Sequence, residues 1–184
     1  MSAPEPVSSD EAAMRRQFEN LVTEYSADMY RFAFWLGGEE QLARDVVQEA
    51  CLRAWRSFSR LHDIHAGKAW LFTIIRREHA RHFQRKRLPT SDIEDHEVAD
   101  HTAWADPEQV GSDQEIRQAI ERLPQNYREP LLMQVLGGMS CKEIADALEV
   151  KSGAVMTRLF RARQKLKVLL EEDSASNGGS DELR

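Results

Sequence analysis

Length, composition and charge place this chain among ordinary globular proteins rich in charge. Its 184 residues are 30% charged and 41% hydrophobic, and no apolar run approaches the roughly 20 residues that span a bilayer. The N-terminus lacks the order of basic and then apolar residues that directs secretion, and Cys51 and Cys141 lack CxxC spacing. We therefore expect a cytoplasmic protein with reduced thiols and no direct membrane insertion.

The net charge of -6 is unevenly distributed. Residues 14–87 hold 14 Lys and Arg against 9 Asp and Glu, and residues 117–170 hold 10 against 5. Between these two bodies, residues 88–116 hold 9 acidic residues and no Lys or Arg. Two basic bodies joined by an acidic segment are compatible with a polyanion bound at two places.

The first basic body is predicted to form three helices. Apolar residues recur at spacings of three and four from Phe18 to Leu36, which is typical of an amphipathic helix. Pro89 ends the last of the three, because the residue before a proline avoids helical geometry. The helices are expected over 14–36, about 40–60 and about 68–87, in a domain that covers 14–88 after a disordered tail of 1–13.

The second predicted helix leaves one polar face uncovered. Its small apolar residues, such as Val46 and Ala50, share one arc and are expected to pack inward. An exposed leucine among acid and amide side chains indicates a surface for a protein partner, although a single exposed leucine is also common. The uncovered face carries Asp45, Gln48, Glu49, Leu52 and Arg56.

The third predicted helix ends in a basic stretch, residues 76–87, with six Lys and Arg and aromatic residues nearby, among them Trp70 and Phe83. Such a combination suits single-stranded or melting DNA, because the phosphates are neutralised while exposed bases stack. A basic helix end is also often only solvated, and several of these aromatic side chains are expected in the core.

A flexible acidic linker is expected over 89–112, where the pattern has no usable periodicity and includes Pro107. The helical pattern returns in a second domain, over 113–170, and a disordered tail is expected over 171–184. The last two of its four predicted helices have the spacing of a helix-turn-helix, from Ser140 to Leu159, with Ser140 and Ser152 as expected caps.

The second helix of this motif has a face suited to DNA. An apolar arc from Val155 through Leu166 to Leu169 is expected to point inward, and no acidic residue interrupts Lys151 to Lys167. The other side can meet phosphates and base edges, whereas a solvated helix in a structural bundle is disfavoured by the capping and the turn length. The outward and flanking side chains are Ser152, Thr157, Arg158, Phe160, Arg161, Arg163 and Lys165.

Three segments together resemble the extracytoplasmic-function sigma factors of the sigma-70 family: ARDVVQEACLRAWRSF, KAWLFTIIRREHARHFQRKR and IERLPQNYREPLLMQVLGGMSCKEIADALEVKSGAVMTRLFRARQKL. The resemblance implies an all-α protein of two small domains. The first would bind core RNA polymerase, a complex with β and β′ subunits, and open the minus-ten element, and the second would read the minus-thirty-five element. It implies no cofactor and no catalysis, and an anti-sigma protein that can hold the factor near the membrane.

The resemblance also places individual residues. It implies that the uncovered face of the second helix binds polymerase and that the loop after this helix captures a flipped base. It also implies that the third helix contacts the separated DNA strands. Arg77 and Arg81 stand where many members carry Asn and Asp, and Glu149 stands where Gly is common, which is tolerable if its backbone avoids positive φ. The residues implied at the minus-ten element are His62, Asp63, His65, Lys68, Trp70, Arg76, Arg77, Arg81 and Arg85.

Two alternatives remain. A helix-turn-helix transcription regulator that is not a polymerase subunit explains the second domain, but it needs neither the uncovered face nor the basic helix. A metal hydrolase is suggested by His62-x-x-His65 and His79-x-x-His82, yet no cluster of cysteines or carboxylates completes a metal site. Neither a phosphate-binding loop nor a nucleophile elbow is visible.

Overall fold

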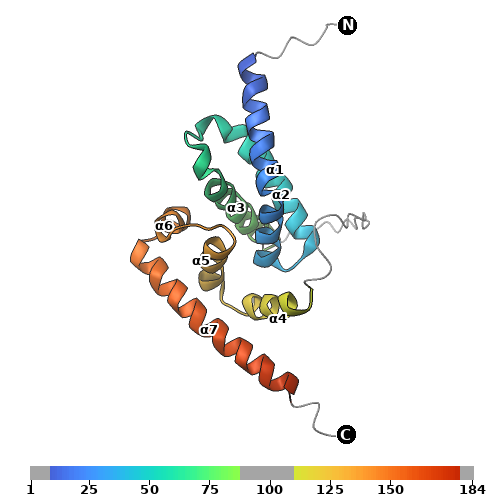
Figure 1. Cartoon of the computed structure of the whole chain (residues 1–184), viewed down its shortest axis with the longest axis vertical. Helices are drawn as coiled ribbons and strands as arrows, with labels where there is room; N and C mark the ends of the chain where they lie inside the picture. The colour runs from blue at the N-terminus through green and yellow to red at the C-terminus, as the bar shows by residue number, and fades with distance from the viewer. Residues whose placement is uncertain (1–8, 88–109, 179–184) are drawn as a thin grey trace.

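The structure, a computed structural model, describes residues 9–87 and 110–178, and the regular elements in these ranges are all helices (Figure 1). The N-terminal lobe comprises α1 (Ser9–Gly37), α2 (Glu40–Ser57), the short 3-10 helices η1 (Phe58–Arg60) and η2 (Ile64–Ala66), and α3 (Gly67–Arg87). The C-terminal lobe comprises α4 (Val110–Glu121), α5 (Gln125–Val135), α6 (Cys141–Leu148) and α7 (Ser152–Gly178). The predicted all-α class is confirmed.

Several helix boundaries differ from the sequence prediction. α1 begins at Ser9 rather than Met14, with two acidic residues in its first turn, where carboxylates interact favourably with the helix dipole. α4 begins at Val110, inside the predicted linker, and α7 continues to Gly178, well past residue 170. The rest of the predicted linker and of both tails lies outside the described residues.

The N-terminal lobe packs its three long helices around one apolar core. Met29 and Phe32 of α1 are fully buried, and the Phe32 ring stacks on Phe72 of α3 with 4.4 Å between the ring centroids. α2 buries mostly small residues, as its pattern predicted, so its backbone approaches the other two helices closely. Gly38 adopts φ +77, a left-handed geometry that ends α1 and that glycine adopts without strain.

The C-terminal lobe contains the predicted helix-turn-helix, formed by α6 and α7. The predicted capping box is confirmed: the Ser140 hydroxyl accepts the Glu143 N–H, and the Glu143 carboxylate accepts the Ser140 N–H at 2.8 Å. The hydrogen bonds from Ser140 hold the pKa of Glu143 below its usual range. Ser152, predicted as the cap of the next helix, is instead its first residue.

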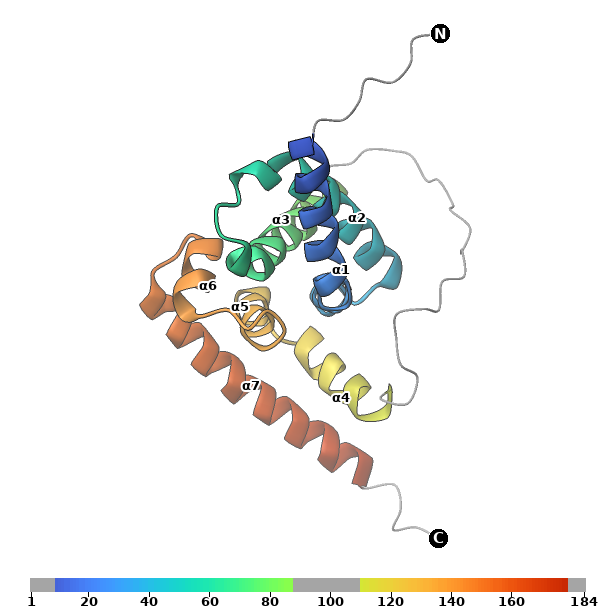
Figure 2. The same cartoon turned by 45° about the horizontal axis from the view of Figure 1, so that its top comes forward.

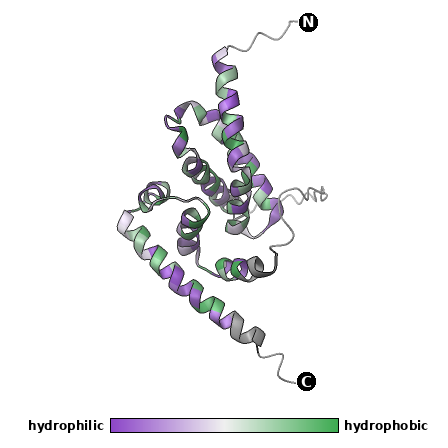
Figure 3. Cartoon of the chain, viewed as in Figure 1, coloured by the Kyte–Doolittle hydropathy of each residue, from purple (hydrophilic) through white to green (hydrophobic). Residues whose placement is uncertain are grey.

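α7 buries only the first part of its apolar arc. Val155, Leu159 and Ala162 are buried, as predicted, against α5 and α6. Leu166 and Leu169, predicted to point inward, are only partly buried, and Leu169 lines a surface pocket with Leu123 and Pro124 of the turn between α4 and α5. Hydrophilic and hydrophobic residues alternate along α7 (Figure 3), and none of the described helices is long and apolar enough to cross a membrane.

The two lobes pack against each other. α5 lies between α7 on one side and α1 and α3 on the other (Figure 2). Leu131 and Leu132 of α5 belong to the same apolar cluster as Leu36 and Phe72 of the N-terminal lobe. Sequence patterns predicted two bodies, but they did not predict that the bodies share a core.

Candidate nucleic-acid and protein interfaces

The predicted partner-binding face of α2 is open. Its five residues are exposed, Leu52 to 48% of its surface, while Val46 and Ala50 on the opposite side are buried. Gln41 donates a hydrogen bond to Asp45 at 3.0 Å, which orients one carboxylate of this face. The structure therefore brings together the side chains Asp45, Gln48, Glu49, Leu52 and Arg56 on one surface.

A groove between α1 and α2 continues this face. Two half-buried aromatic residues, Phe18 and Trp55, form part of its wall, with 5.2 Å between their ring centroids. Burial raises the pKa of the Cys51 thiol, so this cysteine is a weak nucleophile. The lining residues are Glu11, Arg15, Phe18, Glu19, Gln48, Cys51, Leu52 and Trp55.

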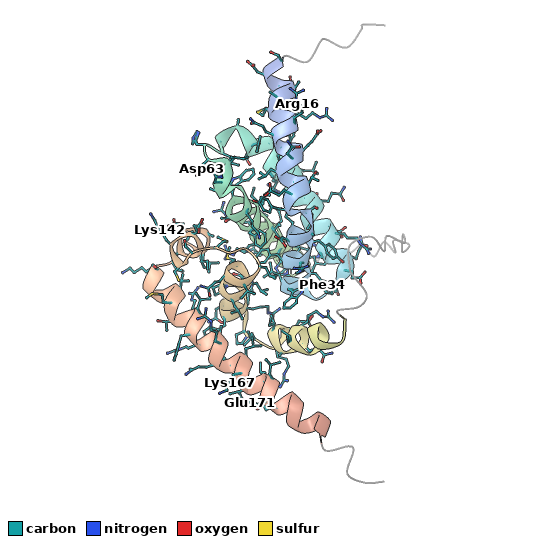
Figure 4. The ribbon with its side chains drawn as sticks, in the orientation of Figure 1. Arg16, Phe34, Asp63, Lys142, Lys167 and Glu171 are labelled. Carbon is teal, nitrogen blue, oxygen red and sulfur yellow. The ribbon has the colours of Figure 1, made fainter. Side chains whose placement is uncertain are left out.

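The loop before α3 presents polar side chains to solvent. His62, Asp63 and His65 are all exposed, and the Asp63 carboxylate accepts the His65 N–H at 2.9 Å, which fixes the turn (Figure 4). Lys68, predicted to contact DNA, instead pairs with Asp28 of α1 at 2.7 Å and is only 27% exposed. This loop is therefore an open surface with one of its predicted cations engaged inside the protein.

The arginines predicted on α3 are mostly paired within the protein. Arg81 lies 2.7 Å from the buried carboxylate of Glu78, which Arg53 of α2 approaches to 2.6 Å. Arg76 and Arg77 are paired with acidic residues of the C-terminal lobe, Arg76 with Glu129 and Arg77 with Glu149. Trp70 is half-buried beside Phe58, and the side chain of Arg85 lies outside the described residues.

His79 is a buried histidine of α3 and not a surface ligand. Its side chain is 4% exposed, and neither ring nitrogen has a hydrogen-bond partner among the described residues. Burial, together with the nearby Arg128, lowers its pKa from 6.5 to about 4, so the ring is neutral at pH 7. Within residues 9–87 and 110–178, no three His, Cys, Asp or Glu side chains gather as a metal site would require.

The residues predicted on the outward face of α7 are largely exposed. Thr157, Phe160 and Arg161 are exposed, Phe160 to 61% of its surface, and Arg158 lies at the edge, half-buried. Ser152 and Lys165 are exposed as well, whereas Arg163 donates a hydrogen bond to Gln134 of α5. An exposed aromatic ring beside an exposed arginine is compatible with contact to a nucleic-acid groove.

The turn between α6 and α7 does not meet the condition under which a residue other than glycine is tolerated without strain. Glu149 adopts φ +56, a left-handed geometry. Among the described residues it is the one non-glycine with positive φ. The Glu149 N–H donates to carbonyls of α6, so the residue closes that helix as a glycine would.

Sequence reasoning missed the residues that join the lobes. Arg128 donates to the Leu36 carbonyl at 3.0 Å, and burial lowers its pKa from the usual value. Glu129 is 5% exposed and accepts a hydrogen bond from Gln125 at 2.6 Å. One signal was available, since Glu129 shares a helical face with Leu132 and Met133, where a lone acid is expected to need a partner.

Comparison with known proteins matches both lobes. The sequence model described as Sigma-70 region 2 matches residues 21–88, and the one described as Sigma-70, region 4 matches residues 113–166. The chain is 32% identical to the ECF RNA polymerase sigma factor EcfG of Rhodopseudomonas palustris over 82% of this chain and 83% of that protein. It is 30% identical to the RNA polymerase sigma-H factor of Pseudomonas aeruginosa over 85% and 88% of the respective chains.

Two solved structures share the fold. The sigma factor RpoE from Bartonella quintana, in complex with the anti-sigma factor NepR, superposes with a TM-score of 0.66 at 21% identity, over 85% of this chain and 98% of that one. CnrH, in complex with the cytosolic domain of CnrY, superposes with a TM-score of 0.64 at 24% identity, over 86% and 90%.

Proposed function

This chain belongs to the extracytoplasmic-function sigma factors of the sigma-70 family. On that premise we propose which of its surfaces bind polymerase and which bind promoter DNA. Sigma factors bind core RNA polymerase and direct it to promoters, and they are initiation factors rather than enzymes. We propose that 14–88 is the domain for polymerase and the minus-ten element, and that 113–170 is the domain for the minus-thirty-five element.

The observation that carries this proposal is the outward face of α7. Phe160 is 61% exposed beside the exposed Arg161, on the second helix of a capped helix-turn-helix. A guanidinium in that position can hydrogen-bond a guanine edge in the major groove, while Arg158 and Lys165 at the sides neutralise phosphates. The alternative of a regulator outside polymerase leaves the region 2 match at residues 21–88 unexplained.

The face of α2 is proposed to hold core polymerase. Leu52 supplies apolar area to this contact, and the carboxylates and amide around it supply complementary polar groups. Reversing the charge of Asp45 or Glu49 is expected to weaken polymerase binding while the helices stay folded, because both side chains are exposed. Unchanged binding in a pull-down with core polymerase would contradict this assignment.

Run-off transcription tests the function as a whole. Core polymerase, this protein and a library of promoter fragments are combined, and the transcript starts are sequenced. Starts that depend on the protein and share elements near minus thirty-five and minus ten are expected. DNA binding without any effect on transcription would favour the plain regulator instead.

An anti-sigma protein is proposed as a further partner. The similar structure of RpoE contains the anti-sigma factor NepR, and in this chain the groove between α1 and α2, lined by Leu52, offers a partly apolar binding surface that adjoins the polymerase face. A membrane-bound partner of this kind would hold the factor near the membrane. Pull-downs with the wild-type chain and with Leu52→Asp as matched bait test the assignment, and a partner retained equally by both baits would contradict it.

A further inference from the structure

Three charged side chains link α2 to α3 within the N-terminal lobe. One carboxylate oxygen of Glu78, Oε1, accepts a hydrogen bond from Arg81 at 2.7 Å and lies 2.6 Å from the Nε of Arg53. The Glu78 side chain is 7% exposed, whereas those of Arg53 and Arg81 are 39% and 46% exposed. The carboxylate is therefore buried, while both arginine side chains stay partly in solvent.

This cluster carries more positive charge than Glu78 neutralises. Two guanidinium groups share one carboxylate, and each guanidinium has several N–H donors that a single oxygen atom cannot satisfy. The Arg53 Nε is buried and has no hydrogen-bond partner among the described residues, so its contact with Glu78 is an ion pair without a hydrogen bond. The cluster therefore has both charge and donors left for a second anion.

A purely structural link between the two helices does not explain the second arginine. One arginine would already neutralise Glu78 and join α2 to α3, whereas two guanidinium groups on one oxygen atom repel each other. Partly exposed ion pairs also add little to stability. Two adjacent guanidinium groups are instead typical of sites that bind a phosphate, whose oxygens accept several charge-assisted hydrogen bonds at once.

The cluster lies between two surfaces that we assign to different partners. Arg81 follows Arg77 by four residues on α3, which returns the side chain to within about 40° of the same direction around the helix. Arg53 follows Glu49 of the polymerase-binding face by four residues on α2. The two guanidinium groups are thus positioned at the edge of the α3 surface that we assign to minus-ten DNA.

We propose that Arg53 and Arg81 together bind one backbone phosphate of the opened minus-ten DNA, with Glu78 as the positioning residue that holds the two guanidinium groups side by side. This inference rests on the proposed assignment of α3 to minus-ten DNA, and it adds a DNA contact from α2. A phosphate carries no sequence information, so the contact fixes the path of the strand rather than the base that is read.

A scan of the DNA backbone tests the proposal on the complete holoenzyme. Core polymerase and the full chain are combined with a labelled promoter fragment that run-off transcription has shown to depend on this protein, with its minus-ten region held open by mismatches. Each phosphate of that region is replaced in turn by a neutral methylphosphonate. Fluorescence anisotropy gives the dissociation constant, at one fixed salt concentration because phosphate contacts depend on salt.

Three glutamine variants separate the two arginines from a general loss of charge. Arg53→Gln and Arg81→Gln are each expected to weaken binding by about threefold to tenfold. Arg44→Gln is the matched control, because Arg44 is on the same helix, is 35% exposed and pairs with Glu40 at 3.2 Å. It is expected to change binding by less than about twofold. One methylphosphonate should weaken wild type by a similar factor and have no further effect on Arg53→Gln or Arg81→Gln.

The role of Glu78 is tested in the same scan. Glu78→Gln makes the protein more positive by one charge, so electrostatic attraction alone would tighten binding to DNA. We expect weaker binding instead, and a lost response at the same methylphosphonate position, because the two guanidinium groups separate. Glu78→Asp, which keeps the charge but shortens the side chain, replaces it if Glu78→Gln fails to fold. Tighter or unchanged binding would contradict the positioning role.

The outcomes distinguish this inference from the function on which it rests. If Arg53→Gln behaves like Arg44→Gln, or if no single methylphosphonate cancels the effect of both arginine variants, the shared phosphate is wrong while the assignment of α3 to DNA still stands. If Arg53→Gln is lost from core polymerase in a pull-down, Arg53 belongs to the polymerase face and the inference is wrong. An absence of starts that depend on the protein would contradict the proposed function itself.

A second substitution of Arg53 guards against misfolding. Arg53→Lys keeps a positive charge opposite Glu78 but replaces the planar fork by a single ammonium group. If Arg53→Gln fails to fold, Arg53→Lys is expected to weaken binding by at least about twofold and to reduce the response at the shared phosphate. Binding equal to that of wild type would overturn the proposal.

Discussion

The basic faces of α3 and α7 were predicted from the same kind of pattern, yet the structure treats them differently. On α7, Phe160 and Arg161 stand in solvent, and the acidic residues of the lobe lie elsewhere. On α3, the arginines at 76, 77 and 81 each meet a carboxylate, two of which come from the other lobe. A run of basic residues therefore predicts the affinity of a face for anions, but not whether that face is free.

The largest expected effect is on the pH dependence of stability, and it comes from His79 on the buried side of α3. Its pKa is lowered from 6.5 to about 4, so the folded protein favours the neutral ring and the unfolded chain takes up the proton first. This contribution is fully present above pH 6.5 and is lost as the pH falls towards 4, by roughly 3 kcal/mol. Urea unfolding at pH 7 and pH 4.5 measures it.

His79→Met isolates this contribution, because methionine has a similar volume and no titrating group. Its stability is expected to fall less than that of wild type between the two pH values. His62→Met serves as the control, since His62 is exposed in the loop before α3 and its replacement should leave the pH dependence of wild type intact. The buried-histidine explanation is wrong if both variants follow wild type.

The next effect concerns the free face of α7. Arg161→Ala is expected to lower promoter-specific initiation, because a bidentate contact to a base is lost. The loss of discrimination between promoter sequences is expected to be about 1 to 3 kcal/mol. The free energy of unfolding of this variant should not change, since the Arg161 side chain is exposed. Run-off transcription on matched and mutated promoters distinguishes a base contact from a phosphate contact, which would show as a uniform loss on all sequences.

The shielded ion pair on α3 gives a smaller effect on stability. Glu129→Gln is expected to lower the free energy of unfolding by about 1 to 2 kcal/mol, less than for a fully buried pair because Arg76 keeps some access to water. Glu40→Gln, which breaks the exposed pair with Arg44, is expected to cost less than about 0.5 kcal/mol. Equal urea midpoints for the two variants would show that the pair between the lobes contributes no more to stability than an exposed ion pair.

The smallest effect belongs to the turn that joins α6 and α7. Glu149→Gly is expected to raise the free energy of unfolding by about 0.5 to 1 kcal/mol, because the left-handed backbone is relieved and the exposed pair with Arg77 contributes little. Glu149→Ala, which keeps the backbone strain, is the matched control and should give no such gain. Thermal unfolding of the two variants separates backbone strain from charge.

Local chemistry determined much of this protein from its sequence. The periodicity of apolar residues from Phe18 to Leu36 defined α1, and the Ser140 and Glu143 pair defined the start of α6, because both depend on residues within a few positions of each other. The exposed faces of α2 and α7 followed from the same periodicity. The family followed from the order of the three matched segments, whereas the roles of single residues stay predictions.

Only the tertiary structure decided which charged groups are free. The pairing of Arg76 with Glu129 joins residues that are far apart in the chain, and the left-handed backbone of Glu149 depends on how α6 ends against α7. The apolar arc of α7 is only partly covered after Ala162, where the turn between α4 and α5 lies beside it. Each of these features depends on packing between distant elements, about which a local pattern carries no information.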